Sequence, residues 1–361
     1  MLIYILLFLL LICFSITEQY FKGSKFPEFR IFLFVIFLLF VTFRPVGGDK
    51  DYVSYLLSFD SFRDPLDYFR HYNEWVYFDP MYYLIPSFYK TYVSQTNYAL
   101  MAFFTFALIA LSLKVISVGK LTNLFFLTLL VYFSNYFLLH EMTQIRVGVA
   151  SAIFLFSIPY LVNKKYVSYV VLVLLAMLFH YSALLYFIPL FFSPFHFKQK
   201  IYFVALGIIL VLTFVPTDFI LPFLKINMGD VQVKSNNYIE YAELGVTEQV
   251  NKINVNFLIS YAITLVFTFF INTIQSKNNY AYLLIKLQIL GLFLFQLFSP
   301  IPGFAFRSSE LFMVTQIISI PFFVYIFKNK WLGFSLVILI SAIFLGLNLF
   351  YGKIMQDYFV V

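Results

Sequence analysis

The 361-residue sequence is poor in charged residues and contains one cysteine. Charged residues make up 11% of the chain, whereas a soluble domain has about 25%. This scarcity excludes a soluble core with a polar surface, and a hydrophobic share of 62% with a mean hydropathy of +0.89 indicates a polytopic membrane protein. The lone thiol, Cys13, makes neither an internal disulfide nor a cysteine metal site.

Motifs that carry several common chemistries are also missing. The chain has no GxSxG elbow, no HExxH pair and no Walker loop, which argues against a serine hydrolase, a zinc protease and a P-loop NTPase. It lacks the paired broken midplane helices that are typical of ion-coupled transporters.

Apolar runs separated by polar or Gly/Pro breaks predict an all-α fold with about twelve transmembrane or re-entrant helices. The first run lacks the basic region and cleavage site of a signal peptide, so we expect a retained span. The run 166–195 is long for one span and short for two, and we expect a tight pair with His180 at its apex. The predicted spans are 1–17, 28–45, 97–117, 121–139, 143–162, 166–180, 182–195, 201–222, 254–274, 280–298, 309–327 and 331–350.

The distribution of basic residues predicts the orientation. Six alternate loops hold 12 of the 24 basic residues and two acids, Glu18 and Glu28. Positive loops stay cytoplasmic, so both termini are expected outside, and the net charge of +7 reflects topology rather than nucleic-acid binding. The basic residues are Lys22, Lys25, Arg30, Lys114, Lys120, Lys164, Lys165, Lys198, Lys200, Lys277, Lys328 and Lys330.

We therefore expect a single membrane domain, 1–361, with two long outer loops, 46–96 and 223–253. Aromatic residues at helical spacing in the first loop predict amphipathic helices on the membrane surface. An interfacial aromatic belt is the favoured interpretation, with sugar stacking as the alternative. Asp49-Lys50-Asp51 has the spacing of a metal–nucleotide site, but nucleotide sugars are cytoplasmic and this loop is expected outside.

Several ionisable residues fall at one expected depth, near the outer face. Such groups within spans are costly and usually face a cavity or a partner, so they predict an outward-facing polar site. Simpler roles remain open: Arg307 can pair with Glu310, Arg146 can reach lipid headgroups, and His180 can cap a turn. The residues at this depth are Arg44, Asp49, His140, Arg146, His180 and Arg307.

The chain resembles the EpsG-like, Wzy-type polymerases of bacterial exopolysaccharide, capsule and O-antigen. The resemblance rests on the order and spacing of five segments: "RPVGGDKDYVSY", "DPMYYLI", "TQIRVGVASAI", "LLAMLFHYSALLYFIPL" and "FRSSELFMVTQIISIP". Val147 departs from the family, which often has glutamine after the arginine, and Gln144 is a candidate substitute.

The resemblance implies a glycosyltransferase-C-like fold and an enzyme of the bacterial cytoplasmic membrane. Its substrates are expected to be oligosaccharide repeat units linked to undecaprenyl diphosphate, joined at the outer face without a metal or other cofactor. A chain-length-regulating membrane protein is a possible partner, and no nucleic acid is expected. An O-antigen ligase and a non-enzymatic transporter of lipid-linked oligosaccharide remain alternatives.

The same resemblance assigns roles to the polar residues. Arginine forks suit the diphosphate leaving group, and a base must take the proton of the acceptor hydroxyl. Histidine titrates near neutral pH, so His180 ranks before Asp49 as that base. The expected catalytic residues are His180, Asp49, Arg146 and Arg307, and the expected substrate-binding residues are Arg44, His140, Gln144, Tyr52, Tyr55 and Tyr181.

Overall fold

The computed structural model describes residues 1–21, 27–75, 77–217, 219–220 and 250–355. Within these ranges the chain is helical and has no strand, apart from one isolated bridge between Asp49 and Met355. The all-α prediction is therefore confirmed. The expected outer loop 223–253 lies, up to residue 249, outside the described residues.

The chain divides into two compact units, each of which is described by itself. Unit 1 comprises Met1–Leu190 and Phe323–Val361, and unit 2 comprises Phe191–Phe322. The expected single membrane domain stays a prediction.

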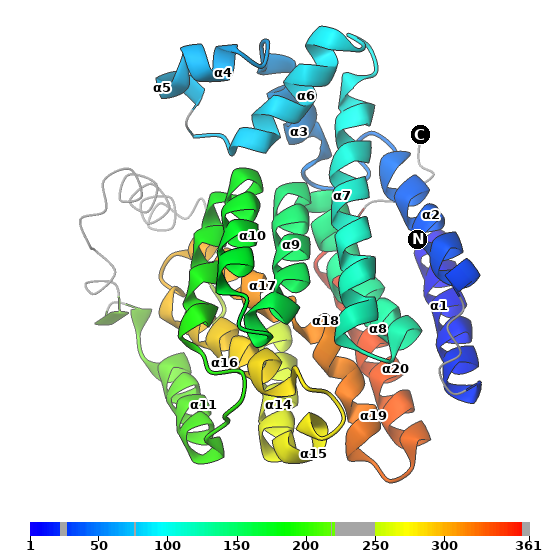
Figure 1. Ribbon diagram of the computed structural model, residues 1–361, viewed down its shortest axis with the longest axis vertical. Coiled ribbons are helices and arrows are strands. Elements are labelled where there is room, and N and C mark those ends of the chain that lie inside the picture. Colours follow the sequence, from blue (N-terminus) through cyan, green and yellow to red (C-terminus); the bar gives the residue numbers. More distant parts are fainter. Residues whose placement is uncertain (22–26, 76, 218, 221–249, 356–361) are drawn as a thin grey trace. The chain divides into compact units, whose positions relative to one another are not determined.

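Unit 1 is built around the long helices α7 and α9, which pack against each other. Helices α2 and α6 pack on α7, and α10 packs on α9. Figure 1 shows α3 to α6, from the expected loop 46–96, grouped at the N-terminal end of α7. The helices are α1 (Leu2–Tyr20), α2 (Pro27–Thr42), α3 (Tyr52–Ser61), α4 (Asp67–Arg70), α5 (Tyr72–Trp75), α6 (Pro80–Tyr92), α7 (Tyr98–Leu121), α8 (Phe125–Tyr132), η1 (Phe133–Thr143), α9 (Ile145–Val162), α10 (Tyr166–Phe179), η2 (Tyr181–Phe191), α19 (Phe323–Ile326), α20 (Lys330–Gly346) and η4 (Leu347–Tyr351).

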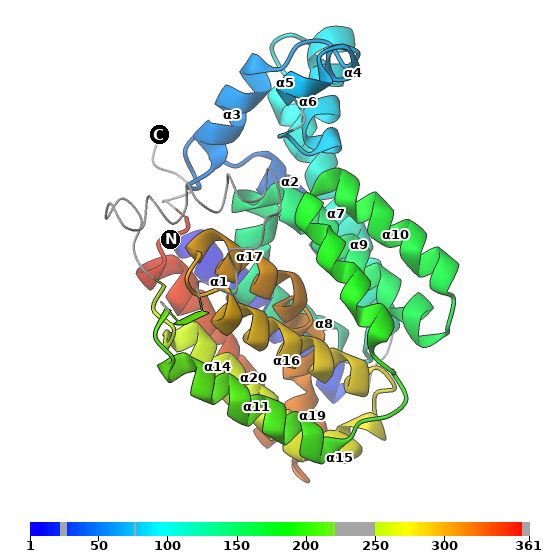
Figure 2. The same ribbon diagram turned by 90° about the vertical axis from the view of Figure 1, so that its left-hand side faces the viewer.

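Unit 2 is arranged around α16, which contacts α11, α14 and α17 (Figure 2). Polar side chains join its helices: Thr264 donates to Gln288 Oε1 at 3.3 Å, and Gln288 Nε2 donates to Ser319. Such bonds associate apolar helices where the hydrophobic effect between them is weak. The helices are α11 (Gln199–Phe214), α14 (Val255–Phe269), α15 (Ile271–Gln275), α16 (Ala281–Leu297), α17 (Pro302–Met313), α18 (Gln316–Ser319) and η3 (Ile320–Phe322).

Five helices are long and apolar enough to cross a membrane, or six if the bent pair Pro302–Met313 and Gln316–Ile326 forms one span. These helices indicate an integral membrane protein. The other predicted spans correspond to shorter or broken apolar helices, so the expected twelve spans are not confirmed. The five helices are Leu2–Tyr20, Tyr98–Leu121, Phe125–Thr143, Ile145–Val162 and Lys330–Tyr351.

Two of the residues counted toward the cytoplasmic loops, Lys114 and Glu18, are buried within helices. Lys114 is buried in α7 and donates to the carboxylate of Glu141. Glu18, in α1, accepts hydrogen bonds from the N–H groups of Phe125 and Phe126 at 3.0 and 2.9 Å, and so satisfies the N-terminus of α8. Both charges serve tertiary contacts, and the charge asymmetry between loops is therefore weaker evidence for orientation than the sequence indicated.

The turn between η1 and α9 brings these two helices into close backbone contact. Gln144 alone separates them, with φ −108° and ψ 58°. A Cβ atom on Gly148 would stand 2.2 Å from the carbonyl oxygen of His140, so this position requires glycine. The contact fixes the first turn of α9, which carries Arg146.

Candidate functional site

Three polar side chains from distant parts of unit 1 meet around Asp79. Arg146 Nη1 donates to Asp79 Oδ2 at 2.7 Å, and His180 Nδ1 lies 3.5 Å from the same oxygen. The backbone N–H of Tyr181 donates to Asp79 Oδ1 at 2.8 Å. We refer to Asp79, Arg146 and His180 as the Asp79 cluster.

Each member of the Asp79 cluster stands at the end of a helix. Asp79 is the N-cap of α6, and Pro80 follows at the start of that helix. An aspartate at this position usually bonds to its own helix, but the Asp79 side chain makes no such bond and faces its distant partners instead. Arg146 lies in the first turn of α9, and His180 follows the last residue of α10 in extended conformation, with φ −157° and ψ 115°.

The surroundings of Asp79 keep its carboxylate charged. Burial alone would raise the pKa of Asp79, but the approach of His180 and the positive charge of Arg146 hold that pKa below its usual value. Asp79 thus offers a stable negative charge that orients Arg146 and His180.

Two groups of the cluster retain bonding capacity. The Arg146 side chain is 29% exposed, and its guanidinium lies 4.5 Å from the centre of the Tyr82 ring. A guanidinium has five N–H donors, and the described residues give Nη1 its partner in Asp79. His180 is 7% exposed, and its buried Nε2 has no hydrogen-bond partner among the described residues. A buried polar atom of this kind calls for a water or a ligand.

A second arginine–aspartate pair in unit 1 is closed to solvent. Arg44 Nε lies 3.2 Å from Asp49 Oδ2, and both side chains have no exposed surface. Arg44 Nη1 donates to the carbonyl of Glu141 at 3.1 Å. The Glu141 carboxylate in turn accepts from Lys114 and from the Tyr132 hydroxyl, the latter at 2.6 Å. We refer to Arg44, Asp49, Glu141, Lys114 and Tyr132 as the sealed network.

The loop that carries Asp49 is also held by the C-terminal segment. Asp49 forms a backbone bridge with Met355, and Lys50 Nζ donates to the carbonyl of Gly352 at 2.8 Å. Asp49 Oδ1 accepts from the N–H of Asp51 at 3.0 Å. Burial raises the pKa of the Asp49 carboxyl, and Arg44 acts against that rise. Asp49 is thus enclosed by its own partners, and its expected role as a base remains a prediction.

His140 and Gln144 precede Arg146 in the sequence: His140 lies in η1, and Gln144 joins η1 to α9. His140 is fully buried in η1, and its Nδ1 lies 3.2 Å from Ser151 Oγ. His140 Nε2 and Gln144 Oε1 are buried without a hydrogen-bond partner in the described part of the chain. The turn next to Arg146 thus contains two polar atoms that the described residues leave unsatisfied.

The three tyrosines expected to bind substrate occupy different settings. The Tyr52 ring lies 5.3 Å from the Arg44 guanidinium and stacks on Phe103, beside the sealed network. Tyr55 is buried against Tyr82. Tyr181 is 39% exposed and anchors Asp79 through its backbone. Of the three, Tyr181 belongs to the surroundings of the Asp79 cluster.

Arg307 lies on α17 of unit 2, apart from the unit that contains the other candidates. Its side chain is exposed. Its expected role as a second diphosphate-binding arginine remains a prediction.

Sequence analysis missed Asp79, Glu141 and Lys114 as interacting residues. Asp79 opens the segment "DPMYYLI", and an aspartate directly before a proline at a helix start was the available signal. Nothing in the sequence pairs Lys114 with Glu141, because they lie on different helices. Among the described residues, no group of three or more His, Cys, Asp or Glu side chains is arranged to hold a metal ion; the expected metal-independent reaction stays a prediction.

The apolar helices define an integral membrane protein with a buried carboxylate that holds an arginine and a histidine. The chain belongs to the EpsG family, whose family model matches residues 28–360, nearly the whole length. This family is similar to Wzy-type polymerases, so the expected resemblance is confirmed and polysaccharide biosynthesis is indicated. No curated protein and no solved structure matched the chain.

Proposed function

We propose that the protein is a membrane glycosyltransferase that joins lipid-linked oligosaccharide repeat units. The observation that carries this proposal is the Asp79 cluster, in which a partly exposed arginine side chain and a histidine share one carboxylate, and the histidine Nε2 has no hydrogen-bond partner among the described residues. Family membership supports the substrate class. The finer substrate is a repeat unit on undecaprenyl diphosphate, polymerised at the outer face of the bacterial cytoplasmic membrane.

Arg146 binds the diphosphate of the donor. The bond between the anomeric carbon and the diphosphate oxygen breaks, and the leaving group carries away the electron pair as a diphosphate anion. A planar guanidinium donates two parallel hydrogen bonds to such oxygens, which a lysine ammonium cannot do. Because Asp79 occupies Nη1, the other guanidinium N–H groups serve the ligand.

His180 takes the proton of the acceptor hydroxyl as that oxygen forms its bond to the anomeric carbon. Asp79 faces Nδ1 and so favours the tautomer that carries its hydrogen there. This leaves the Nε2 lone pair free to accept a proton, in agreement with the absence of a partner for this atom in the described chain. Asp79 acts through His180 and is a positioning residue.

The sealed network supports the reaction indirectly. Its charges are paired with one another, and Arg44 joins the Asp49 loop to the backbone of Glu141. Glu141 precedes Arg146 by five residues, across the turn at Gln144. Arg44 and Asp49 thus hold the turn in place, and His180 is the favoured base.

An O-antigen ligase would use the same leaving group, and a transporter would need no base. Reconstitution of the purified protein with defined lipid-linked repeats distinguishes the three. A ladder of products of increasing length supports the polymerase. A single transfer onto a different acceptor indicates a ligase, and translocation that persists in His180→Gln without any new glycosidic bond indicates a transporter.

The proposed orientation has its own test. A cysteine introduced at Asn73 should react with an impermeant reagent added from outside, whereas one at Lys164 should not. The opposite labelling pattern contradicts an outward-facing site and with it the lipid-linked donor proposed for that face.

A further inference from the structure

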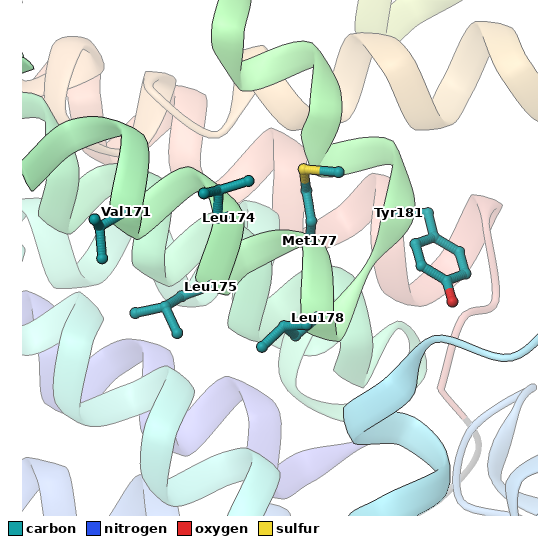
Figure 3. Close-up of a pocket in the computed structure, with 6 residues that line it drawn as sticks. All are labelled: Val171, Leu174, Leu175, Met177, Leu178 and Tyr181. Atoms are coloured by element: carbon teal, nitrogen blue, oxygen red, sulfur yellow. The ribbon is translucent and has the colours of Figure 1, made fainter. Parts of the chain in front are cut away.

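An apolar hollow of about 370 Å³ lies on the surface of α10, directly beside the Asp79 cluster. Five of its lining residues come from α10, and the sixth follows where that helix ends (Figure 3). The residues are Val171, Leu174, Leu175, Met177, Leu178 and Tyr181.

The hollow belongs to the face of α10 that is not used for packing. Tyr169, Val173 and Ala176 form the buried face of this helix. Val171 and Leu174 are each 50% exposed, on the other side. With Val167 and Leu178 they recur at helical spacing, so one aliphatic stripe runs along about three turns from Tyr181 toward the start of the helix.

An exposed aliphatic stripe on a membrane protein is by itself expected to face bulk lipid. What distinguishes this stripe is its polar end. Tyr181 lines the hollow with its ring and donates its backbone N–H to Asp79 Oδ1. Asp79 Oδ2 holds Arg146, whose side chain is partly exposed. The carboxylate of Asp79 thus links the polar end of the apolar surface, at Tyr181, to Arg146, a cation suited to an anionic headgroup.

We propose that this hollow binds the isoprenoid chain of the lipid-linked substrate, with the diphosphate at Arg146; this inference rests on the proposed function. A ligand with a doubly anionic headgroup and a long branched hydrocarbon chain matches both ends of the surface. Met177 and the leucines adapt to the methyl branches of such a chain, because their side chains are flexible and apolar. The hollow thus holds the donor lipid in a position where the anomeric carbon of the donor sugar lies between Arg146 and His180.

The test measures binding of undecaprenyl monophosphate and of geranyl monophosphate to the purified protein in detergent, in which bulk phospholipid is depleted. Leu174→Trp fills the middle of the hollow. Its matched control is Leu39→Trp on α2, since Leu39 is 49% exposed and Leu174 is 50% exposed. Leu175→Trp is the second filling variant, should Leu174→Trp lower the yield of folded protein.

We expect either filling variant to raise the dissociation constant of undecaprenyl monophosphate about tenfold or more, because the added ring takes the place of the chain. Leu39→Trp should leave it unchanged within about twofold, and geranyl monophosphate, whose short chain lies beside Tyr181, should be equally insensitive. Equal binding of undecaprenyl monophosphate by wild type and both filling variants would contradict the proposed binding in the hollow. An equal loss of binding in Leu39→Trp would also contradict it, as would displacement of the probe by equimolar phosphatidylglycerol, because both results indicate binding of bulk lipid.

The two proposals fail separately. If Leu174→Trp and Leu175→Trp bind the long-chain probe normally while the Arg146 variants lose polymerisation, the proposed lipid site in the hollow is wrong and the proposed function stands. If purified wild type binds the probe through the hollow but forms no glycosidic product from defined repeats, the lipid site stands and the proposed polymerase function is wrong.

Discussion

Unit 1 contains two arginine–aspartate pairs that differ in what surrounds them. In the sealed network, the side chains of Arg44 and Asp49 have no exposed surface, and Arg44 also bonds to the backbone of Glu141. In the Asp79 cluster, the Arg146 side chain is 29% exposed and the Asp79 side chain 4%. Both side chains of the arginine–aspartate pair are thus buried in the sealed network, whereas in the Asp79 cluster the arginine side chain is partly exposed.

The difference separates a structural role from a ligand-binding role. A buried charge pair is costly to form and more costly to break, because the remaining partner stays uncompensated in an apolar interior. An open pair loses less when one partner changes, and its free donors are available to a substrate. We therefore expect the sealed network to control the amount of folded protein and the Asp79 cluster to control turnover.

The largest expected effect is on stability, in the sealed network. Glu141→Gln keeps the shape of the side chain and an acceptor for Tyr132, but leaves Lys114 buried and without its counter-charge. We expect a loss of about 3–5 kcal/mol in the free energy of unfolding, as for other buried pairs with one partner removed. The measurement is the decrease in the midpoint temperature of thermal aggregation of detergent-purified protein, monitored by size-exclusion chromatography.

The control for this prediction removes both charges. In Lys114→Met combined with Glu141→Gln, no unpaired charge remains, and most of the lost stability should return. Equal destabilisation by the single and double variants would show that shape rather than charge holds this region.

The next largest effect is on turnover. His180→Gln keeps a polar side chain but removes the proton acceptor, so we expect product formation to fall roughly a hundredfold while donor binding is retained. Asp49→Asn, by contrast, should reduce the yield of folded protein more than the turnover of what remains. The measurement compares initial rates and donor affinity in the same purified preparations.

The opposite result reassigns the base. If His180→Gln turns over normally and folded Asp49→Asn is inactive, Asp49 is the proton acceptor and the sealed network must open during the reaction. If both variants polymerise at the wild-type rate, the Asp79 cluster is structural.

Arginine-to-lysine substitutions sharpen the comparison further. Arg146→Lys retains the charge but loses the planar fork, and we expect product formation to drop about tenfold to a hundredfold, the equivalent of one or two hydrogen bonds to a charged group. The stability of Arg146→Lys should stay near that of wild type, since the site is partly open. Arg307→Lys, in unit 2, is expected to impair polymerisation as well.

The readout is the length and amount of the product ladder, normalised to folded protein. Normal ladders from both lysine variants would exclude diphosphate binding by these arginines. A normal ladder from Arg307→Lys alone would confine the diphosphate site to the Asp79 cluster.

The positions of most helices were predictable from the sequence because apolar runs and their breaks mark them directly. The predicted apex at His180, for example, coincides with the residue between α10 and η2. The number of membrane spans was not predictable, because a run of apolar residues does not specify whether its helix is long enough to cross the membrane. The run 309–327 contains a break between Met313 and Gln316 that hydropathy does not reveal.

The candidate site was predictable in part for a related reason. Arg146 and His180 stand out against apolar neighbours, so their rarity marks them. Asp79 lies in a polar loop where an aspartate is ordinary, and only the fold places it beside them. The pairing of Lys114 with Glu141 was not predictable, because the two residues lie on different helices and 27 positions apart in the sequence.

The smallest expected effect concerns acid sensitivity and tests whether Asp79 anchors the cluster as a carboxylate. His180 and Arg146 lower the pKa of Asp79 against the opposing effect of burial, so the folded state holds its proton less tightly than the unfolded chain does. A group of this kind stabilises the fold above its unfolded pKa, about 4 for aspartate, and the contribution disappears as the pH falls through the lower folded value. Wild type should therefore lose thermal stability more steeply than Asp79→Asn between roughly pH 5 and pH 3. Other carboxylates, including Asp67, titrate equally in both proteins, so the difference between the two stability curves reports Asp79 alone. Parallel curves would mean that the charge of Asp79 does not hold Arg146 and His180 together.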